Sequence, residues 1–311
     1  MQTTQGRSPA PDVEGTAAGR LDPGARVDWR SAVPFLVVNA IPLLIVFTGF
    51  SRRALILLAV TFIVRQFCIT GGYHRYFSHR SYSLPRLPQL LLAIGAGTAA
   101  QKGPLWWASQ HRIHHRTADT AADPHTPRKG FWWSHVGWIL SDRYWQTDLG
   151  AVSDFARYPE LRFLDKHDWI APWALGIACF LVGGLQGLLV GFFLSTVLLW
   201  HLTFLINSLA HVWGRRSFAT SDDSRNSALL ALVTLGEGWH NNHHRHPRSA
   251  RIGFRWWQWD PTYYGIWTLS ALRVARDVHG VPRGGRQGEV EPLSTPGWRT
   301  RSRPGRSTGP L

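Results

Sequence analysis

Hydrophobic positions gather in two long blocks along the chain, and most charged positions lie between and beyond them. The first block opens with residues 32–50, which carry no charge over 19 residues, and resumes at residues 54–64 after Arg52 and Arg53. As an α-helix, such a segment spans about 28 Å, close to the ~30 Å thickness of a bilayer's hydrocarbon core. We therefore predict two membrane helices here, the second continuing through residues 67–74.

The second hydrophobic block is interrupted by the pair Gly183 and Gly184. This interruption predicts two further helices, roughly residues 169–185 and 188–211, joined by a tight uncharged turn. The expected fold is an all-α integral membrane protein with four transmembrane helices in two hairpins. A shorter apolar segment, residues 86–99, is expected to form a helix at the membrane surface.

Two hairpins place the N-terminal arm, the segment between the hairpins and the chain after His211 on one side of the membrane. Lysine and arginine concentrate in these parts. The positive-inside tendency therefore predicts that this side is cytoplasmic, together with both termini and the active site. In a bacterium the membrane would be the plasma membrane. We expect residues 31–279 to form the membrane domain with a cytosolic helical cap, between a disordered arm (residues 1–30) and a disordered basic tail (residues 280–311).

Composition narrows the possible partners. The 311 residues include 34 Lys and Arg against 19 Asp and Glu, a formal charge of +15, which indicates an anionic partner such as phospholipid head groups or a phosphate-bearing substrate. The 17 Trp suit a membrane–water boundary. No nucleic-acid-binding motif accompanies them, so nucleic acid is not expected as a partner. Cys68 and Cys179 lie in apolar stretches, which excludes a disulfide framework or a cysteine-based metal site.

Nine of the 15 histidines fall into four clusters near the expected helix ends. They are His74 and His79; His111, His114 and His115; His211; and His240, His243 and His244. In a helical HxxHH motif, which occurs twice, the first and last histidines lie about 40° apart around the axis, and the adjacent pair about 100° apart. Neighbouring histidines can therefore serve two different metal ions.

The other two clusters follow a different spacing. His74 and His79 would lie about 140° apart on an ideal helix, so they can share a metal ion only if the helix end distorts or the side chains reach around. Asn207 precedes His211 by four residues, which places a second polar group on the same helix face.

Imidazole ligands suit zinc, copper, iron and nickel. Nine imidazoles without a thiolate exceed the four ligands of a structural zinc site and predict two metal ions with four or five nitrogens each. A carboxylate-type di-iron centre needs paired Glu-x-x-His motifs and two further glutamates. Only Glu237 and His240 match that motif. A metal transporter, the non-enzymatic alternative, would place its ligands deep within the membrane helices rather than at their ends.

At these residues the sequence resembles the membrane fatty-acyl desaturases, in particular the stearoyl-CoA desaturase-like family and its bacterial members. The resemblance covers roughly residues 35–278. Its specific stretches are GGYHRYFSHRSY at 71–82, WWASQHRIHHRTADTAADPH at 106–125, GFWWSHVGWIL at 130–140, NSLAH at 207–211 and GEGWHNNHH at 236–244.

The resemblance implies four membrane helices under a cytosolic helical cap that carries a di-iron site. One iron ion would take five of the nine histidines and the other four, and Asn207 would hold a water near the second ion. The implied reaction uses O₂ and two electrons to introduce a cis double bond, near carbon 9, into a saturated acyl chain. A related membrane di-iron hydroxylase of alkyl chains or lipids is the enzymatic alternative.

The chemistry of the implied reaction is consistent with these residues. An unactivated C–H bond resists acids, bases and nucleophiles. Its cleavage therefore requires a redox metal that activates O₂. The protein must then supply a narrow apolar tunnel, for which Trp107 and Trp138 are candidate wall residues. Lys102, Arg128 and Lys129 are candidates for binding phosphates of the acyl carrier.

The identity of the carrier stays open among CoA, a phospholipid and acyl carrier protein. Positions that help to hold CoA in the animal acyl-CoA enzymes differ here, where Lys102 and the pair Ser109–Gln110 stand. Electrons are expected from a separate ferredoxin, rubredoxin or cytochrome, and the basic face favours an acidic carrier. His125 and His135, within the resemblance, are candidates for groups behind the metal ligands or near the substrate.

Overall fold

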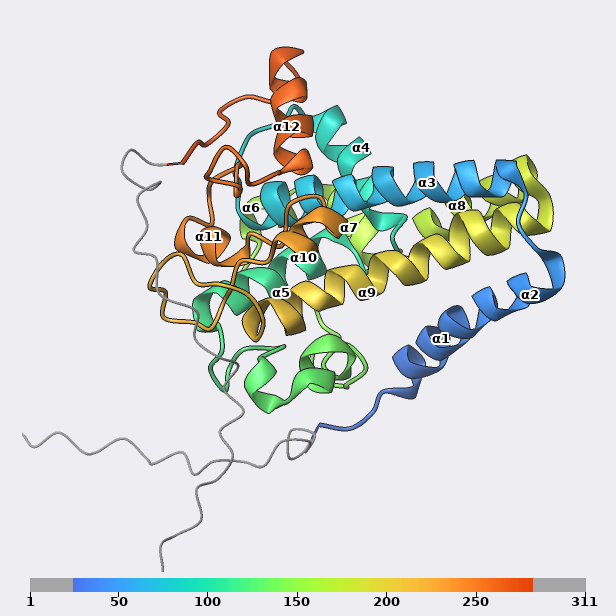
Figure 1. The fold of residues 1–311 in the computed structure, drawn as a ribbon, viewed down its shortest axis with the longest axis horizontal. Coiled ribbons are helices and arrows are strands. Elements are labelled where there is room, and N and C mark those ends of the chain that lie inside the picture. The colour runs from blue at the N-terminus through green and yellow to red at the C-terminus, as the bar shows by residue number, and fades with distance from the viewer. Residues whose placement is uncertain (1–24, 282–311) are drawn as a thin grey trace, which may run out of the picture.

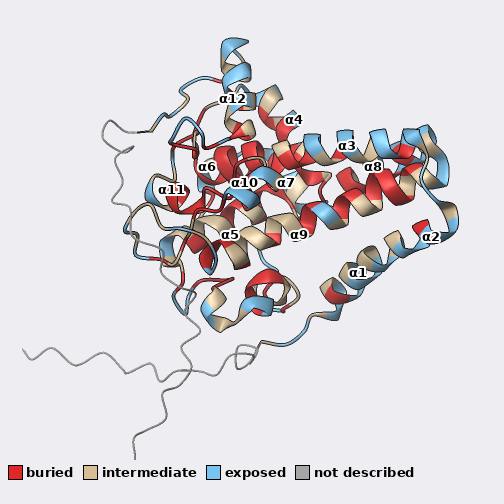
Figure 2. Ribbon diagram, viewed as in Figure 1, coloured by how far each residue is buried: buried red, intermediate tan, exposed pale blue. Residues whose placement is uncertain are grey.

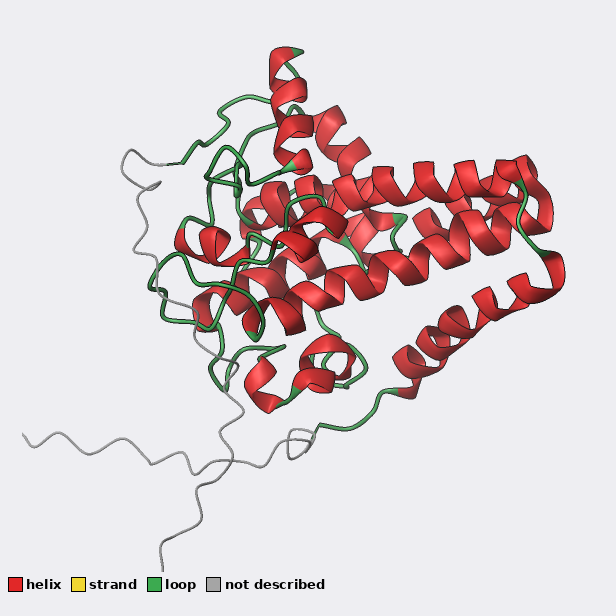
Figure 3. Ribbon diagram, viewed as in Figure 1, coloured by secondary structure: helices red, strands yellow, loops and turns green. Residues whose placement is uncertain are grey.

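The computed structural model describes residues 25–281, and within this range the chain is helical, with no named strand (Figures 1 and 3). The predicted arm and tail lie largely outside the described residues. The membrane-type helices are α1 (Trp29–Ala40), η1 (Ile41–Leu44), α2 (Ile45–Thr48), α3 (Arg52–Phe67), η2 (Cys68–Ser78), α8 (Ile170–Gln186), η5 (Gly187–Leu194), α9 (Ser195–Ser208) and η6 (Leu209–His211). The remaining helices are α4 (Arg86–Gly97), α5 (Pro104–Thr117), η3 (Pro127–Lys129), η4 (Trp133–Gly137), α6 (Ser153–Ala156), α7 (Pro159–Lys166), α10 (Ala228–Val233), α11 (His240–Arg245) and α12 (Pro261–Ala271).

Three continuous helical runs are long and apolar enough to cross a membrane: Trp29–Thr48, Arg52–Ser78 and Ile170–His211. The third has 42 residues, and a straight helix of that length would measure about 63 Å, roughly twice a hydrocarbon core. The run is not straight, because Gly184 has non-helical angles (φ 61°, ψ −152°).

Beyond Gly184 the chain folds back, so that α9 returns alongside α8 (Figure 1). A Cβ atom on Gly176 of α8 would lie 3.4 Å from the ring of Phe192 in η5, which places the two arms in contact. Only glycine adopts the positive φ of residue 184 without strain. The two helices expected at residues 169–185 and 188–211 therefore occur as two arms of one run.

The outer faces of these runs are apolar and exposed, whereas buried residues concentrate at the opposite end of the molecule (Figure 2). Phe47 is 84% exposed, Val46 79% and Leu181 77%. Apolar surface on this scale is unusual for a soluble monomer and indicates contact with lipid.

Arg65 lies in the middle of a membrane-type run and is buried by protein. Its guanidinium donates to the hydroxyl of Thr196 (2.7 Å), to the hydroxyl of Ser195 and to the carbonyl oxygen of Thr98 (3.3 Å). These acceptors come from α9 and from the end of α4, so one buried cation joins three elements. A cation inside a membrane is tolerated when its donors are satisfied in this way.

The remaining helices, which include α5 and α11, lie together at one end of the molecule (Figure 1). With their connecting loops they form a compact cap. The largest cluster of buried apolar residues lies here and joins η2, α4, α5 and α9. This apolar cluster fixes the positions of the helix ends that carry the clustered histidines.

Close contact between η5 and its neighbours depends on Gly187. A Cβ atom there would lie 2.3 Å from the carbonyl oxygen of Cys179. We therefore expect Gly187→Ala to lower stability by about 1–3 kcal/mol, because the backbone must move to admit a methyl group. Thermal unfolding in detergent or nanodiscs measures the effect. Leu185→Ala, at a position 53% exposed on the lipid face, serves as the control. Equal stabilities of the two variants would contradict this packing argument.

Candidate metal centre

The end of the second run supplies His74 and His79 through a distorted helix. Residues Cys68–Ser78 form a π-helix, in which backbone bonds span five residues rather than four. The amide of His79 donates to the carbonyl oxygen of His74 at 3.3 Å, which continues this five-residue step. The wider turn brings the two side chains to the same side, with ring centroids 5.0 Å apart. The distortion that this spacing requires is therefore present.

The two HxxHH motifs lie on helices, one on α5 and one on α11. His111 and His115 of α5 point to one group of rings, whereas His114 points to another. In α11 the assignment is reversed, with His240 and His244 in the second group and His243 in the first. The divergence of adjacent histidines expected from the helical period is thus observed in both motifs.

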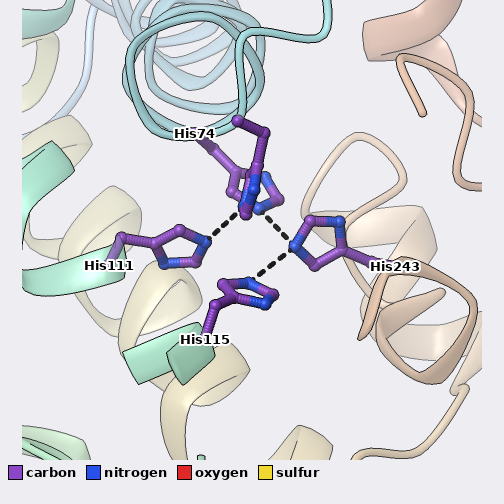
Figure 4. A group of neighbouring side chains, drawn as sticks. His74, His111, His115 and His243 are labelled. Carbon is purple, nitrogen blue, oxygen red and sulfur yellow. Dashed lines mark hydrogen bonds between the residues drawn. The ribbon is translucent and has the colours of Figure 1, made fainter. Parts of the chain in front are cut away.

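The nine histidines converge in two groups. The five-histidine group comprises His74, His79, His111, His115 and His243, and the four-histidine group comprises His114, His211, His240 and His244. Within each group, the ring nitrogens all lie within 4.8 Å of one another. Figure 4 labels four members of the five-histidine group, His74 of η2, His111 and His115 of α5 and His243 of α11, whose rings point inward. Elements separated by more than 160 residues thus supply a single site.

Carboxylates behind the rings define which nitrogen carries the proton. The Nδ1 atoms of His114, His211 and His244 face Asp123 (3.0 Å), Asp119 (3.0 Å) and Asp222 (2.8 Å), and Nδ1 of His74 faces Glu237 (2.6 Å). An ionised carboxylate can only accept, so each of these rings carries a proton on Nδ1, and the neutral form of each ring directs the Nε2 lone pair toward the group.

This arrangement fits a metal ion. The Nε2 atoms of His114 and His244 lie 3.4 Å apart, and in the neutral rings neither has a proton to share with the other. His240 approaches His211 and His244 at 3.0 and 3.1 Å and can donate to only one of them. Two nitrogens bound about 2.1 Å from one ion at a right angle would lie about 3.0 Å apart. A cation bound by these lone pairs removes the repulsion between them.

Protonation of the rings provides little of this positive charge. Burial lowers the pKa of His114, but the Asp123 carboxylate outweighs this effect and raises it. Burial first, and then the neighbouring histidines, hold the pKa values of five rings well below their ordinary range, so these rings are neutral at pH 7. They are His79, His111, His115, His240 and His243. Neutral imidazole is the form that binds metals.

Three further sequence-predicted residues lie near the two groups. Asn207 lies one helical turn before His211 and lines a cavity that also reaches His111. His125 is buried, packs against His114 with ring centroids 4.2 Å apart and approaches Asp123. His135 lies farther along, where it hydrogen-bonds His201 (3.0 Å) and Ser208 (3.1 Å).

Sequence reasoning missed the four carboxylates as partners of the histidines. Asp119 and Asp123 follow the α5 motif in the stretch TADTAAD, and Asp119 adopts a left-handed conformation (φ 59°) that aspartate tolerates better than most residues. Their proximity to an HxxHH motif was the only available signal. Asp222 lies far along the chain from most of the ligands and carries no comparable signal.

A cavity of about 420 Å³ extends from His111 of the five-histidine group between α1, α5, α8 and α9. Its walls are mostly aromatic and aliphatic, and they include Trp107, Trp138, Phe192 and Phe204. Trp107 also stacks on His111, with centroids 5.0 Å apart, so the wall is continuous with the five-histidine group. Such a cavity suits an apolar chain better than a polar ligand.

The three basic residues proposed to bind the carrier lie in different places. Lys102 lines the cavity, and its ammonium group lies 3.0 Å from the ring centroid of Trp145. Burial lowers the pKa of Lys102, an effect that the Asp168 carboxylate opposes. Arg128 instead pairs with Asp223 (3.0 Å), and Lys129 donates to the carbonyl oxygen of Ala121 (3.3 Å). Neither is among the described residues that line the cavity.

Comparison with known proteins identifies the family. The family model for fatty acid desaturases matches residues 51–275. The chain is 39% identical over 254 residues to the probable lipid desaturase ADS3.2, chloroplastic, of Arabidopsis thaliana, an alignment that covers 81% of this chain and 70% of that protein. The chain therefore belongs to the fatty acid desaturase family, which confirms the resemblance seen in the histidine motifs.

Two further relatives differ in their acyl carriers. The sn-2 palmitoyl-lipid 9-desaturase of Nostoc sp. (strain 36) is 37% identical over 263 residues, covering 83% of this chain and 92% of that protein. The acyl-CoA C20 Delta5-desaturase of Anemone leveillei is 36% identical over 258 residues, covering 80% and 83%. Membership of the family, with lipid desaturases among its relatives, implies an oxidoreductase that acts on a fatty-acyl substrate.

Two separate groups of donors should bind two ions independently. We expect His79→Ala to reduce the metal content from two ions per chain to about one, because it removes a ligand from the five-histidine group alone. His279→Ala, an exposed ring outside both groups, should retain two. Elemental analysis of purified protein measures both contents. A His79→Ala variant that keeps two tightly bound ions would contradict the grouping.

Proposed function

We propose that this protein is an O₂-dependent, integral-membrane fatty-acyl desaturase that introduces a cis double bond, near carbon 9, into a saturated chain. The observation that carries the proposal is the junction between the histidine groups and the aromatic cavity. Trp107 belongs to the cavity wall and stacks on His111, so a chain in the cavity would lie beside the metal centre.

The proposed cofactor is a pair of iron ions. Fatty acid desaturases generally use iron, and the donor set here consists of nine imidazoles, four of which have a carboxylate behind them. The five-histidine group would hold one ion and the four-histidine group the other, with Asn207 near the second. When bound, the ions would supply the activation of O₂ that removal of hydrogen from an unactivated carbon requires.

The chain's own residues orient the substrate and exclude water. Phe35 of α1 stacks on Trp200 of α9 with centroids 5.5 Å apart, and both line the cavity. An extended acyl chain packed against these rings has little freedom to rotate, which favours attack at one carbon pair. The same rings keep the reacting position dry.

The proposed topology has four membrane crossings. The break at Gly184 divides the 42-residue run into two arms, and each arm, like the two preceding runs, is long enough to approach the thickness of a bilayer. An even number of crossings leaves α1's start and the cap on one side. The basic charge of the chain supports a cytoplasmic cap.

The carrier is proposed to be a glycerolipid or CoA, and the electrons to come from a separate ferredoxin, rubredoxin or cytochrome. The relatives support both carriers, because one is named as acting on a palmitoyl-lipid and another on an acyl-CoA. Lys102 and Arg30 are the basic residues of the cavity lining, so they are the candidates for contact with a phosphate group.

Expression in a host that lacks its own desaturase tests the function directly. Gas chromatography of the lipids should show a monounsaturated product, whereas a hydroxy fatty acid would indicate the related hydroxylase instead. His115→Ala and His244→Ala should each abolish the olefin while the protein still inserts in the membrane, because each removes a ligand from a different group. Full olefin formation by either variant would rule out the ligand assignment.

The carrier can be identified with variants of two basic residues. If CoA is the carrier, Lys102→Ala should raise the apparent KM for acyl-CoA about tenfold, because a charge-assisted hydrogen bond to phosphate is lost. Arg128→Ala is the control, since Arg128 pairs with Asp223 away from the cavity. An unchanged KM for acyl-CoA in Lys102→Ala would exclude this lysine as a CoA contact.

A further inference from the structure

Carboxylates are divided unequally between the two histidine groups. The four-histidine group has three, since Asp119, Asp123 and Asp222 each accept from the Nδ1 atom of one of its rings at 2.8–3.0 Å. The five-histidine group has one, Glu237, which accepts from His74 at 2.6 Å. All four carboxylates are buried.

The single carboxylate of the five-histidine group is also neutralised by an arginine. Arg75, which is fully buried, contacts Glu237 at 2.9 Å and Asp260 at 2.9 Å. Its charge offsets one of these two negative charges. The environment behind the five-histidine group is therefore only weakly anionic.

The carboxylates of the four-histidine group are stabilised by neutral donors instead. Asp119 accepts from the amide of Asp223 at 2.7 Å, Asp123 from the amide of Asp119 at 2.9 Å, and Asp222 from the amide of Ser224 at 3.0 Å. One oxygen of Asp119, Oδ1, is buried and has no hydrogen-bond partner in the described residues. Amide donors orient a carboxylate without cancelling its charge, so negative charge accumulates behind this group.

We propose that this asymmetry separates the two iron positions in reduction potential, so that the ion in the four-histidine group is the first to become ferric and the last to be reduced. The inference rests on the proposed di-iron function and assigns Asp119, Asp123 and Asp222 as positioning residues. Negative charge nearby stabilises the more positive ion, and a carboxylate bound to Nδ1 makes the opposite nitrogen a stronger donor.

The number of imidazoles acts in the same direction. Five neutral nitrogens favour the ferrous ion, whereas a group of four leaves a position that an oxygen ligand can take, which favours the ferric ion. Of the two electrons that an external donor delivers to the oxidised pair, the first would then reduce the five-histidine position and the second the four-histidine position.

Stepwise oxidation of the iron-loaded protein tests the order. One equivalent of ferricyanide takes one electron from the diferrous protein, becomes ferrocyanide and leaves one ferric and one ferrous ion. With ¹⁵N-labelled histidine, electron–nuclear double resonance of the wild-type protein should find four imidazole nitrogens coupled to the ferric ion. Five coupled nitrogens on that ion would overturn the proposal without any variant.

Carboxylate variants provide an independent test by potentiometric titration. Asp222→Asn should raise the potential of the first oxidation step by about 59 mV, which corresponds to a tenfold change for one electron, and should change the second step less. Glu237→Gln should show the opposite pattern, with the larger shift in the second step. Asp223→Asn is the matched control, because this neighbouring carboxylate pairs with Arg128 and contacts no ligand ring, so it should shift neither step.

Iron content separates the possible failures. A wild-type protein that binds fewer than two irons would refute the di-iron function itself. A protein that binds two irons, but in which Glu237→Gln shifts the first step more than Asp222→Asn, would refute only the order of oxidation. If Asp222→Asn loses iron, Asp119→Asn replaces it in the comparison, and the wild-type nitrogen count still decides.

Discussion

The structure depends on one electrostatic constraint, namely that nine imidazoles must point unprotonated nitrogens at two shared positions inside a buried region. Left alone, such lone pairs repel each other. Buried carboxylates lie behind some of the rings, as Asp123 lies behind His114. Each holds a proton on the Nδ1 atom of its ring, which leaves the Nε2 atom available to bind a cation. The elements that carry the rings must then meet at one membrane face, and the cap around α5 and α11 brings them there.

Much of the centre is encoded in local spacing and could be predicted. The helical period alone separates His114 from His115, because adjacent side chains on a helix diverge, and the structure divides them as expected. The apolar blocks likewise predicted the membrane-type helices, since length and lack of charge are properties of the sequence itself. The interruption at Gly184 predicted the reversal between α8 and α9.

Other features depend on contacts that no local pattern contains. The partner of His244 is Asp222, which lies in a loop, and two acceptors of Arg65, Ser195 and Thr196, lie about 130 residues away on α9. No local pattern around Arg65 indicates which residues accept its hydrogen bonds. The roles of the basic residues were harder still to predict. Lys102 lines the cavity, whereas Arg128 pairs with an aspartate elsewhere, although both precede similar aromatic stretches.

The π-helix of residues 68–78 also constrains how this segment can change during evolution. A surface loop absorbs an inserted or deleted residue by rearranging locally, but here each residue sets the rotation of the next ring about the helix axis. Loss of one residue would convert the wide turn to an ordinary one and swing His79 away from His74, while leaving the helix itself intact. Homologues should therefore vary in length in the cap loops, and conserve the number of residues between the membrane helix and its last histidine.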